Sequence, residues 1–183
     1  MELKGSRVLL RDLRAEDFDT AHAYGADVDV VQYMPWGPNS PEDTRAFLQR
    51  AMGEAAATPR TTFELAIIET GPDGGGHVGG CGLMGRRAQY HDEYEIGYCL
   101  CRKAWGRGLA SEAVGLMLDF AFGAVGAHRI FASIDAHNKA SQGVAQKHGF
   151  RLEGKMLRDT LIRGEWRDSF VYALVSDEYK GTG

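Results

Sequence analysis

Apolar and polar residues alternate in several short segments of the chain, a period of two that is typical of strands with one buried face. This alternation predicts seven strands, at residues 7–13, 63–68, 77–84, 93–101, 129–134, 151–161 and 165–175. The glycine-rich segment 71–76 separates the second strand from the third, and it favours a hairpin connection between antiparallel neighbours. A phosphate-binding loop is the alternative there, but no helix follows the segment to supply a dipole.

Four other segments have the composition or the apolar spacing of helices, and they lie at residues 15–26, 41–57, 109–125 and 139–149. The second helix has a clear start, because Ser40 can cap it and Pro41 suits the first helical position. The fourth helix ends at Gly149, a natural C-terminal cap. Helices and strands in this order predict an α/β fold.

Composition narrows the class of protein. The chain has 183 residues, 44% of them hydrophobic, which is enough to bury one core, and no repeat or linker divides it. We therefore expect one domain over residues 1–183. No apolar run approaches the ~20 residues of a membrane helix, and the N-terminus has no apolar signal core, so we expect a cytoplasmic protein with no membrane partner. The net charge of −4 argues against nucleic-acid binding.

The three cysteines, Cys81, Cys99 and Cys101, are an odd number and lack the CxxC spacing of a zinc site. We interpret them as small buried apolar residues. No histidine lies beside Cys99 or Cys101 in sequence to activate a nucleophilic thiol, so cysteine catalysis is not expected. The six histidines are scattered without an HExxH motif, and no metal is expected either.

The stretch KAWGRGLAS, residues 103–111, joins a predicted strand to a predicted helix. Gly106 and Gly108 permit positive φ, so backbone N–H groups can converge on an anion at the positive end of the helix dipole. A tight turn without a ligand would also explain the glycines. The P-loop sequence is absent, and a dinucleotide fingerprint would place Ser111 at the third glycine, with Asp135 as the acid that ends the next strand.

Residues 103–108 resemble the Gln/Arg-x-x-Gly-x-Gly/Ala pyrophosphate loop of the GNAT acyl-CoA-dependent N-acetyltransferases. Further segments are similar to this family in the same order, namely Glu95–Tyr98, Ser111–Ala113, Asn138–Ser141, Gly149–Phe150 and Leu152–Gly154. The early segment Tyr33–Pro38 is similar to the ribosomal-protein N-acetyltransferase (RimJ/RimL-like) group.

The resemblance implies a mixed, mostly antiparallel seven-stranded sheet with about four helices, splayed between its fourth and fifth strands. It also implies acetyl-CoA as co-substrate. The cofactor-binding residues that it implies are Cys99, Leu100, Cys101, Lys103, Gly106, Arg107, Gly108, Leu109, Ala110, Ser111, Asn138 and Ser141. Backbone groups of the loop would hold the pyrophosphate, helped by mobile positive charge on Lys103 and Arg107, and the splayed strand would hold pantetheine and polarise the acetyl carbonyl.

The resemblance further implies direct transfer of the acetyl group to an amine, which needs a base for the amine and an acid for the thiolate. Glu95 is the first candidate base, provided that burial raises its pKa, and Asp159 is its rival. Asp168 is a third candidate base, but we interpret it mainly as a structural residue. Ala145 stands where many members of the family have a tyrosine acid, so Ser141 is the expected donor, with helix capping alone as the alternative.

The function expected from this resemblance is transfer of acetyl from acetyl-CoA to a primary amine, first of all a protein or peptide N-terminal α-amine. A small amine, such as an antibiotic, an amino-acid conjugate or a polyamine, is the second acceptor class. A non-catalytic acyl-CoA-binding sensor is the alternative from another class, and a nicotinamide oxidoreductase is weaker. The acceptor pocket should be lined by the first two helices, residues 34–39 and the last hairpin, and a homodimer is possible.

Overall fold

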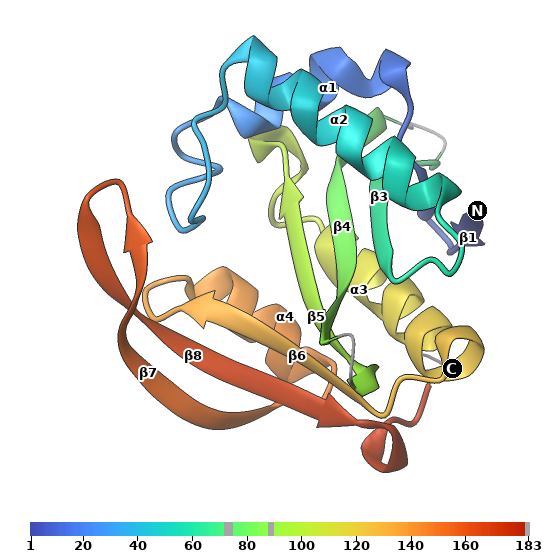
Figure 1. Cartoon of the computed structure of the whole chain (residues 1–183), viewed down its shortest axis with the longest axis vertical. Coiled ribbons are helices and arrows are strands. Elements are labelled where there is room, and N and C mark those ends of the chain that lie inside the picture. The colour runs from blue at the N-terminus through green and yellow to red at the C-terminus, as the bar shows by residue number, and fades with distance from the viewer. Residues whose placement is uncertain (72–74, 88–89, 182–183) are drawn as a thin grey trace.

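The computed structural model describes residues 1–71, 75–87 and 90–181. Its strands form one sheet in the order β1-β2-β3-β4-β5-β6-β8-β7, antiparallel throughout except between β5 and β6 (Figure 1). The strands are β1 (Glu2–Lys4), β2 (Val8–Asp12), β3 (Thr62–Glu69), β4 (Gly76–Arg87), β5 (Tyr90–Leu100), β6 (Arg129–Asp135), β7 (Arg151–Ile162) and β8 (Glu165–Val175). The α/β fold is confirmed, and β3 and β4 are antiparallel neighbours on either side of the glycine-rich segment.

Within the described residues the sheet has eight strands, where seven were expected. The additional strand is β1, whose three residues pair with β2 at the edge of the sheet. A segment of three residues is too short to show a period of two, so the alternation could not reveal it.

Helices cover both faces of the sheet. The α-helices are α1 (Phe18–Gly25), α2 (Pro41–Ala56), α3 (Leu109–Phe120) and α4 (Lys139–Lys147). Successive residues of β3 face opposite sides of the sheet: Leu65 belongs to the core cluster with α3, whereas Ala66 packs with Leu48 of α2. Ser40 caps α2 as expected: its hydroxyl accepts a hydrogen bond from the Asp43 N–H at 3.1 Å.

The sheet opens between β5 and β6, as Figure 1 shows near its centre. The parallel pairing of these two strands covers only three residue pairs, from Glu93–Arg129 to Glu95–Phe131. Beyond that point β5 stays paired with β4 as far as Leu100, and β6 stays paired with β8 as far as Asp135. In the described part of the sheet, the facing edges of β5 and β6 therefore have no strand partner past Glu95.

Candidate active site

The glycine loop precedes α3 and is shaped as an anion-binding turn. Gly106 and Gly108 have φ of +71° and +80°, a region that favours glycine, and Gly108 is the N-cap of α3. The first helical hydrogen bond runs from the Glu112 N–H to the Gly108 carbonyl at 3.1 Å. The N–H groups of the intervening residues 109–111 have no backbone acceptor among the described residues, so they are available to an anion at the helix N-terminus.

The two basic side chains of this loop, Lys103 and Arg107, have different environments. Lys103 is exposed, whereas the Arg107 guanidinium pairs with the buried Glu69, at 3.0 Å for one of the two contacts. Arg7 donates a hydrogen bond to the Arg107 carbonyl at 3.0 Å. Arg107 therefore ties the loop to β3.

Glu112 fixes the other side of the loop. Its carboxylate accepts hydrogen bonds from the Arg7 N–H at 2.7 Å, the Val8 N–H at 3.1 Å and the Ser6 hydroxyl at 3.1 Å. Burial acts to raise the pKa of Glu112, but these hydrogen bonds outweigh it and hold the pKa below its usual range. The first turn of α3 is thereby attached to the start of β2.

The side chains of three predicted loop residues contact other parts of the protein. Leu109 is buried in the core, and Ala110 packs against it. The Ser111 hydroxyl lies 3.1 Å from His148 Nε2, which also lies 2.8 Å from the Ser111 carbonyl. This contact joins α3 to the end of α4.

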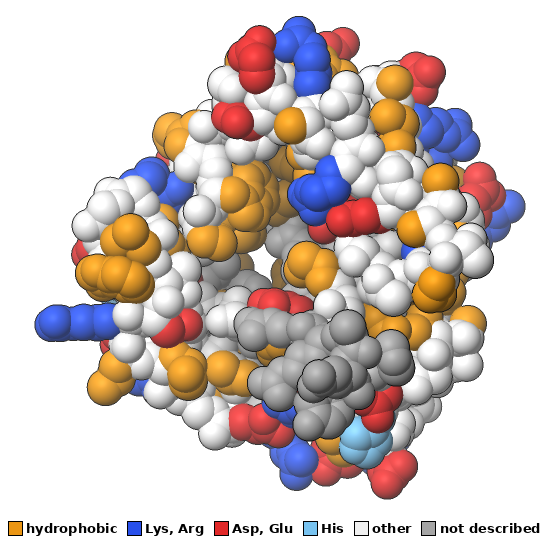
Figure 2. All heavy atoms as spheres, viewed as in Figure 1, with side chains coloured by type: hydrophobic (Ala, Val, Ile, Leu, Met, Phe, Trp, Pro, Cys, Tyr) orange, Lys and Arg blue, Asp and Glu red, His pale blue; other side chains and the backbone are white. Residues whose placement is uncertain are grey.

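A cavity of about 1100 Å³ lies on the face of the sheet that α1 and α2 cover. It is lined by both helices, the 33–39 loop and the β7–β8 hairpin, the segments expected for an acceptor pocket, and Figure 2 shows the hollow near the centre of this face. Five acids line it among the described residues, with Arg50 as the one Lys or Arg. The acids are Asp43, Glu64, Glu95, Asp135 and Asp159.

Glu95 and Asp159, the two predicted bases, reach this cavity from different elements. Glu95 is half-buried and is the last β5 residue paired with β6, so it stands where the sheet opens. Asp159 is exposed on β7. The cavity thus brings together two residues that lie far apart in sequence.

Asp159 reaches the cavity because β7 is irregular. The register moves from Met156–Ser169 to Thr160–Arg167, so the three residues 157–159 lie opposite Asp168 alone. Asp168 accepts a hydrogen bond from the Arg158 N–H at 2.9 Å and pairs with Lys155 at 2.6 Å, and the hydrogen bond from Lys155 lowers its pKa most. Asp168 does not line the cavity, in keeping with the structural role expected of it.

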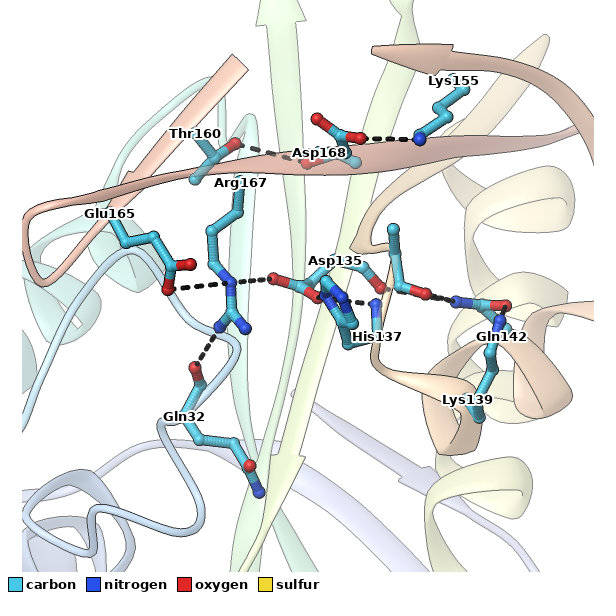
Figure 3. A network of polar contacts seen from close by, with 12 residues as sticks. Gln32, Asp135, His137, Lys139, Gln142, Lys155, Thr160, Glu165, Arg167 and Asp168 are labelled. Atoms are coloured by element: carbon cyan, nitrogen blue, oxygen red, sulfur yellow. Dashed lines mark hydrogen bonds and ion pairs between the residues drawn. The ribbon is translucent and has the colours of Figure 1, made fainter. Parts of the chain in front are cut away.

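A polar network holds the wall of the cavity at the end of β6 (Figure 3). Asp135 accepts a hydrogen bond from the His137 N–H at 2.7 Å and lies 3.4 Å from the Arg167 guanidinium. Arg167 also donates to the Gln32 carbonyl at 3.4 Å, and Gln142 of α4 donates to the Asp135 carbonyl at 3.4 Å. Asp135 therefore joins β6 to β8 and α4 and, through Arg167, to Gln32, which is a structural position rather than that of a ribose-binding acid.

The sequence matches the acetyltransferase (GNAT) domain family over residues 7–151. The chain belongs to the GNAT acetyltransferase family. The predicted fold and the predicted enzyme class, an acetyl-CoA-dependent N-acetyltransferase, are both confirmed. No helix in the described ranges is long and apolar enough to cross a membrane.

Relatives of this GNAT chain extend over its whole length. An uncharacterized N-acetyltransferase of Bacillus subtilis, YnaD, is 28% identical over 183 residues, 98% of this chain and 99% of the relative. The crystal structure of a GNAT acetyltransferase from Bacillus anthracis is 31% identical and has a TM-score of 0.85, with 97% of this chain and 100% of that chain covered.

Two relatives with stated acceptors match about half of this GNAT chain. The ribosomal protein uS5-alanine N-acetyltransferase of Escherichia coli is 33% identical over 93 residues, 51% of this chain and 47% of the relative. The spermidine N(1)-acetyltransferase of the same organism is 24% identical over 89 residues, 49% of this chain and 48% of the relative. One acts on a protein and the other on a polyamine.

Ser141 of this GNAT chain lies in the first turn of α4 and contacts Tyr98 of β5. Its N–H donates to the Asn138 side chain at 3.1 Å, which makes Asn138 the N-cap of α4. Its hydroxyl lies 2.9 Å from the Tyr98 hydroxyl, and burial raises the pKa of Tyr98 to about 12. Tyr98 lines the cavity, and Ala145 is buried in the core. Tyr98 was missed as a candidate donor, because only the fold brings it to Ser141.

Residues 99–101, the last two of β5 and the residue that follows it, lie at the opening of the sheet. The Leu100 carbonyl accepts a hydrogen bond from the Trp105 indole at 2.8 Å. Cys99 lines the cavity, and burial raises the pKa of its thiol to about 12; burial also raises the pKa of Cys101. Thiols with such pKa values stay protonated near neutral pH, which agrees with the expectation that neither cysteine is a nucleophile.

Glu64 of β3 is a second residue that sequence reasoning missed. It is half-buried, it lines the cavity, and burial raises its pKa to about 7. Because Glu64 lies between the apolar residues Phe63 and Leu65, the sequence predicts only that its side chain faces the opposite side of the strand. Glu64 is half-buried because α2 covers that face of the sheet, and no pattern within β3 could predict this burial.

Proposed function

We propose that this GNAT enzyme transfers the acetyl group of acetyl-CoA to a primary amine of a small cationic molecule bound in the cavity. The observation that carries the proposal is the set of five acids around the cavity, with Arg50 as the one Lys or Arg among the described lining residues. Such a wall attracts cations and disfavours anions. It favours the second acceptor class named from the sequence, of which a polyamine is an example.

The chain has the groups that a bound acetyl-CoA molecule requires. The N–H groups of residues 109–111 and the positive-φ glycines would face its pyrophosphate, with Lys103 nearby. The unpaired edges of β5 and β6 would accept its pantetheine arm, with Asn138 and Ser141 at the start of α4. When bound, acetyl-CoA supplies an activated acetyl thioester.

The remaining chemistry concerns protons and charge. A carboxylate of the cavity takes the proton that the acceptor ammonium must lose, and Glu95 and Asp159 are the two named from the sequence. Backbone N–H groups on the free edge of β5 stabilise the charge that develops on the acetyl oxygen. The Ser141 hydroxyl, with Tyr98 behind it, supplies a proton to the departing thiolate.

A protein or peptide α-amine is the second candidate acceptor. Its supporting observation is a group of exposed large apolar side chains on the hairpin and the adjoining loop, which suits contact with a polypeptide. They are Trp36, Met156, Leu157, Leu161 and Trp166. Of these, Trp36 also lines the cavity.

Calorimetric titration with acetyl-CoA, followed by mass spectrometry of the products from a panel of amines, tests the proposal. The panel contains polyamines, monoamines of matched size and peptides with free N-termini. We expect steady turnover that is faster with polyamines than with neutral or anionic amines. Preference for peptides would select the second candidate, and acetyl-CoA binding without turnover of any amine would favour the sensor.

A further inference from the structure

Glu64 lies in the middle of β3, on the face of the sheet that carries the cavity. We propose that Glu64 is the group that takes the proton from the acceptor ammonium, in place of Glu95 or Asp159. The inference rests on the proposed function, since it requires an amine in the cavity. It is carried by the position of the Glu64 carboxyl relative to the opening between β5 and β6.

Glu64 is the first member of a row that crosses three strands. It pairs with Gly82 of β4, which pairs with Gly97 of β5. A Cβ atom at Gly82 would lie 2.6 Å from Glu64 Oε2, so the carboxyl rests directly over this glycine. A Cβ at Gly97 would meet only Met84, at 4.0 Å. No side chain in the row therefore separates the carboxyl from β5.

The dimensions of a sheet place this carboxyl within reach of the transfer point. Neighbouring strands lie about 4.8 Å apart, so a carboxyl over Gly82 is about one strand spacing from Gly97. Gly97 comes two residues after Glu95, where β5 leaves β6. An amine held over Gly97 can give its proton to Glu64 directly or through one water molecule.

The cation that faces Glu64 from α2 does not neutralise it. Arg50 pairs with Glu54 at 3.6 Å, one turn along the helix, and lies over the Phe47 ring at 5.5 Å. Arg50 acts to lower the pKa of Glu64 and Glu54 acts to raise it, but both effects are smaller than that of burial. No hydrogen bond or ion pair to the Glu64 carboxylate is found within the described parts of the chain.

Three further titratable groups near Glu64, a tyrosine and two cysteines, stay neutral near pH 7. Tyr24 of α1 has a pKa well above its usual value because it is buried. The thiols of Cys81 on β4 and Cys99 on β5 also have raised pKa values, for the same reason. Glu64, with a pKa raised by burial to about 7, is thus suited to exchange a proton at neutral pH.

The step is balanced as follows. The N–H bond of the acceptor ammonium breaks, and an O–H bond forms on Glu64. The free amine then bonds to the acetyl carbon, and the carbon–sulfur bond breaks. The thiolate takes a proton from the Ser141 hydroxyl, and the second proton that the nitrogen loses as the amide forms restores that hydroxyl. The proton on Glu64 passes to solvent through the mouth of the cavity, which restores the carboxylate.

The pH dependence of kcat/KM for wild-type enzyme and for Glu64→Gln tests this role. The wild-type value should rise tenfold per pH unit up to about pH 7 and then level, following the titration of Glu64. Glu64→Gln should lower kcat/KM at pH 8 by about 100-fold or more and lose this acid limb, with the KM for acetyl-CoA within about twofold. Glu64→Asp, which keeps a shorter carboxyl, should keep the limb at reduced rate.

Glu95→Gln and Asp159→Asn are the matched variants. If either abolishes the acid limb while Glu64→Gln retains it, the proposal is overturned and that residue is the base. The proposal is equally overturned if Glu64→Gln lowers kcat/KM less than threefold. Circular dichroism and acetyl-CoA binding establish that each variant is folded.

A second measurement separates this inference from the proposed function. Carbon-13 titration of the side-chain carboxyls of the CoA-bound protein should give one resonance with a midpoint near pH 7, absent in Glu64→Gln. A midpoint near 4 for that resonance overturns the inference, whether or not an acceptor is found. Failure of wild-type enzyme to acetylate any amine, with the midpoint still near 7, overturns the proposed function and leaves the titration of Glu64 established.

Discussion

A single carboxyl on β3 affects both the chemistry and the stability of this enzyme. The native state holds Glu64 with a pKa of about 7, whereas an unfolded glutamate has a pKa of about 4.3. Between these two pH values the native state binds a proton that the unfolded state has lost. The free energy of unfolding therefore falls as pH rises through this window, and the loss is complete above the native pKa.

Glu64→Gln should stabilise the protein at alkaline pH, because an amide cannot ionise. We expect the variant to exceed wild type in free energy of unfolding by roughly 3 kcal/mol at pH 8 and by about 1 kcal/mol near pH 5. Urea unfolding at the two pH values measures the difference. A variant less stable than wild type at pH 8 would show that the carboxylate is held by favourable contacts.

Tyr98 and Ser141 form a pair whose removal should affect the release of thiolate. Tyr98→Phe and Ser141→Ala should each lower kcat by about 10- to 100-fold, with little change in the KM for acetyl-CoA, because both hydroxyls belong to one proton path. The double variant should be no slower than the slower single variant. If the kcat losses of the two single variants multiply in the double variant, or if Ser141→Ala leaves kcat unaltered, Ser141 does not protonate the thiolate and has only a structural role at the start of α4.

Among the elements, the loop before α3 is the one that the sequence describes most completely. Its glycines, its position between strand and helix and its basic residues were all visible, because each follows from local backbone chemistry. The tie of Arg107 to Glu69 was not, since β3 lies 38 positions earlier and only the fold brings the two together. The register shift in β7 was hidden too, because apolar alternation continues on both sides of residues 157–159.

Gly108→Asp should abolish acetyl-CoA binding. The substitution forces a side chain into φ +80° and places a negative charge at the N-terminus of α3, where the pyrophosphate is expected. We expect the dissociation constant to rise at least about 100-fold in calorimetry, which is about 2.7 kcal/mol. Gly53→Asp is the matched control, since a Cβ at Gly53 meets nothing within 4 Å. An unchanged affinity of Gly108→Asp for acetyl-CoA would show that the loop does not bind this ligand.

In the whole molecule, the sheet consists of two groups of strands joined by a short parallel contact. In the part of the chain that the structure describes, periodicity predicted seven of the eight strands, and composition, capping residues and apolar spacing predicted the four α-helices. The contents of the cavity wall were only partly predictable. Its acids come from α2, β3, β5, β6 and β7, and their meeting depends on how α2 and the hairpin close over the sheet.

Acetyl-CoA bound across this junction should stabilise the whole chain. At a ligand concentration 100 times the dissociation constant, the expected gain is about 2.7 kcal/mol, seen as an increase in Tm of several degrees. Thermal unfolding with increasing acetyl-CoA measures it, and hydrogen exchange should slow most along β5 and β6. Gly108→Asp should show no increase. An equal increase in that variant would place the ligand elsewhere.

The opening between β5 and β6 also bears on aggregation. Unpaired strand edges recruit strands from other chains, and proteins usually shorten, bend or cover them. Here the two inner edges face each other across a wedge that closes at Glu95, so a foreign strand has no long straight edge to extend. The outer edges are blunted as well, by the three residues of β1 and the irregular β7. The enzyme can therefore keep backbone groups free for its ligand without offering a template for fibre growth.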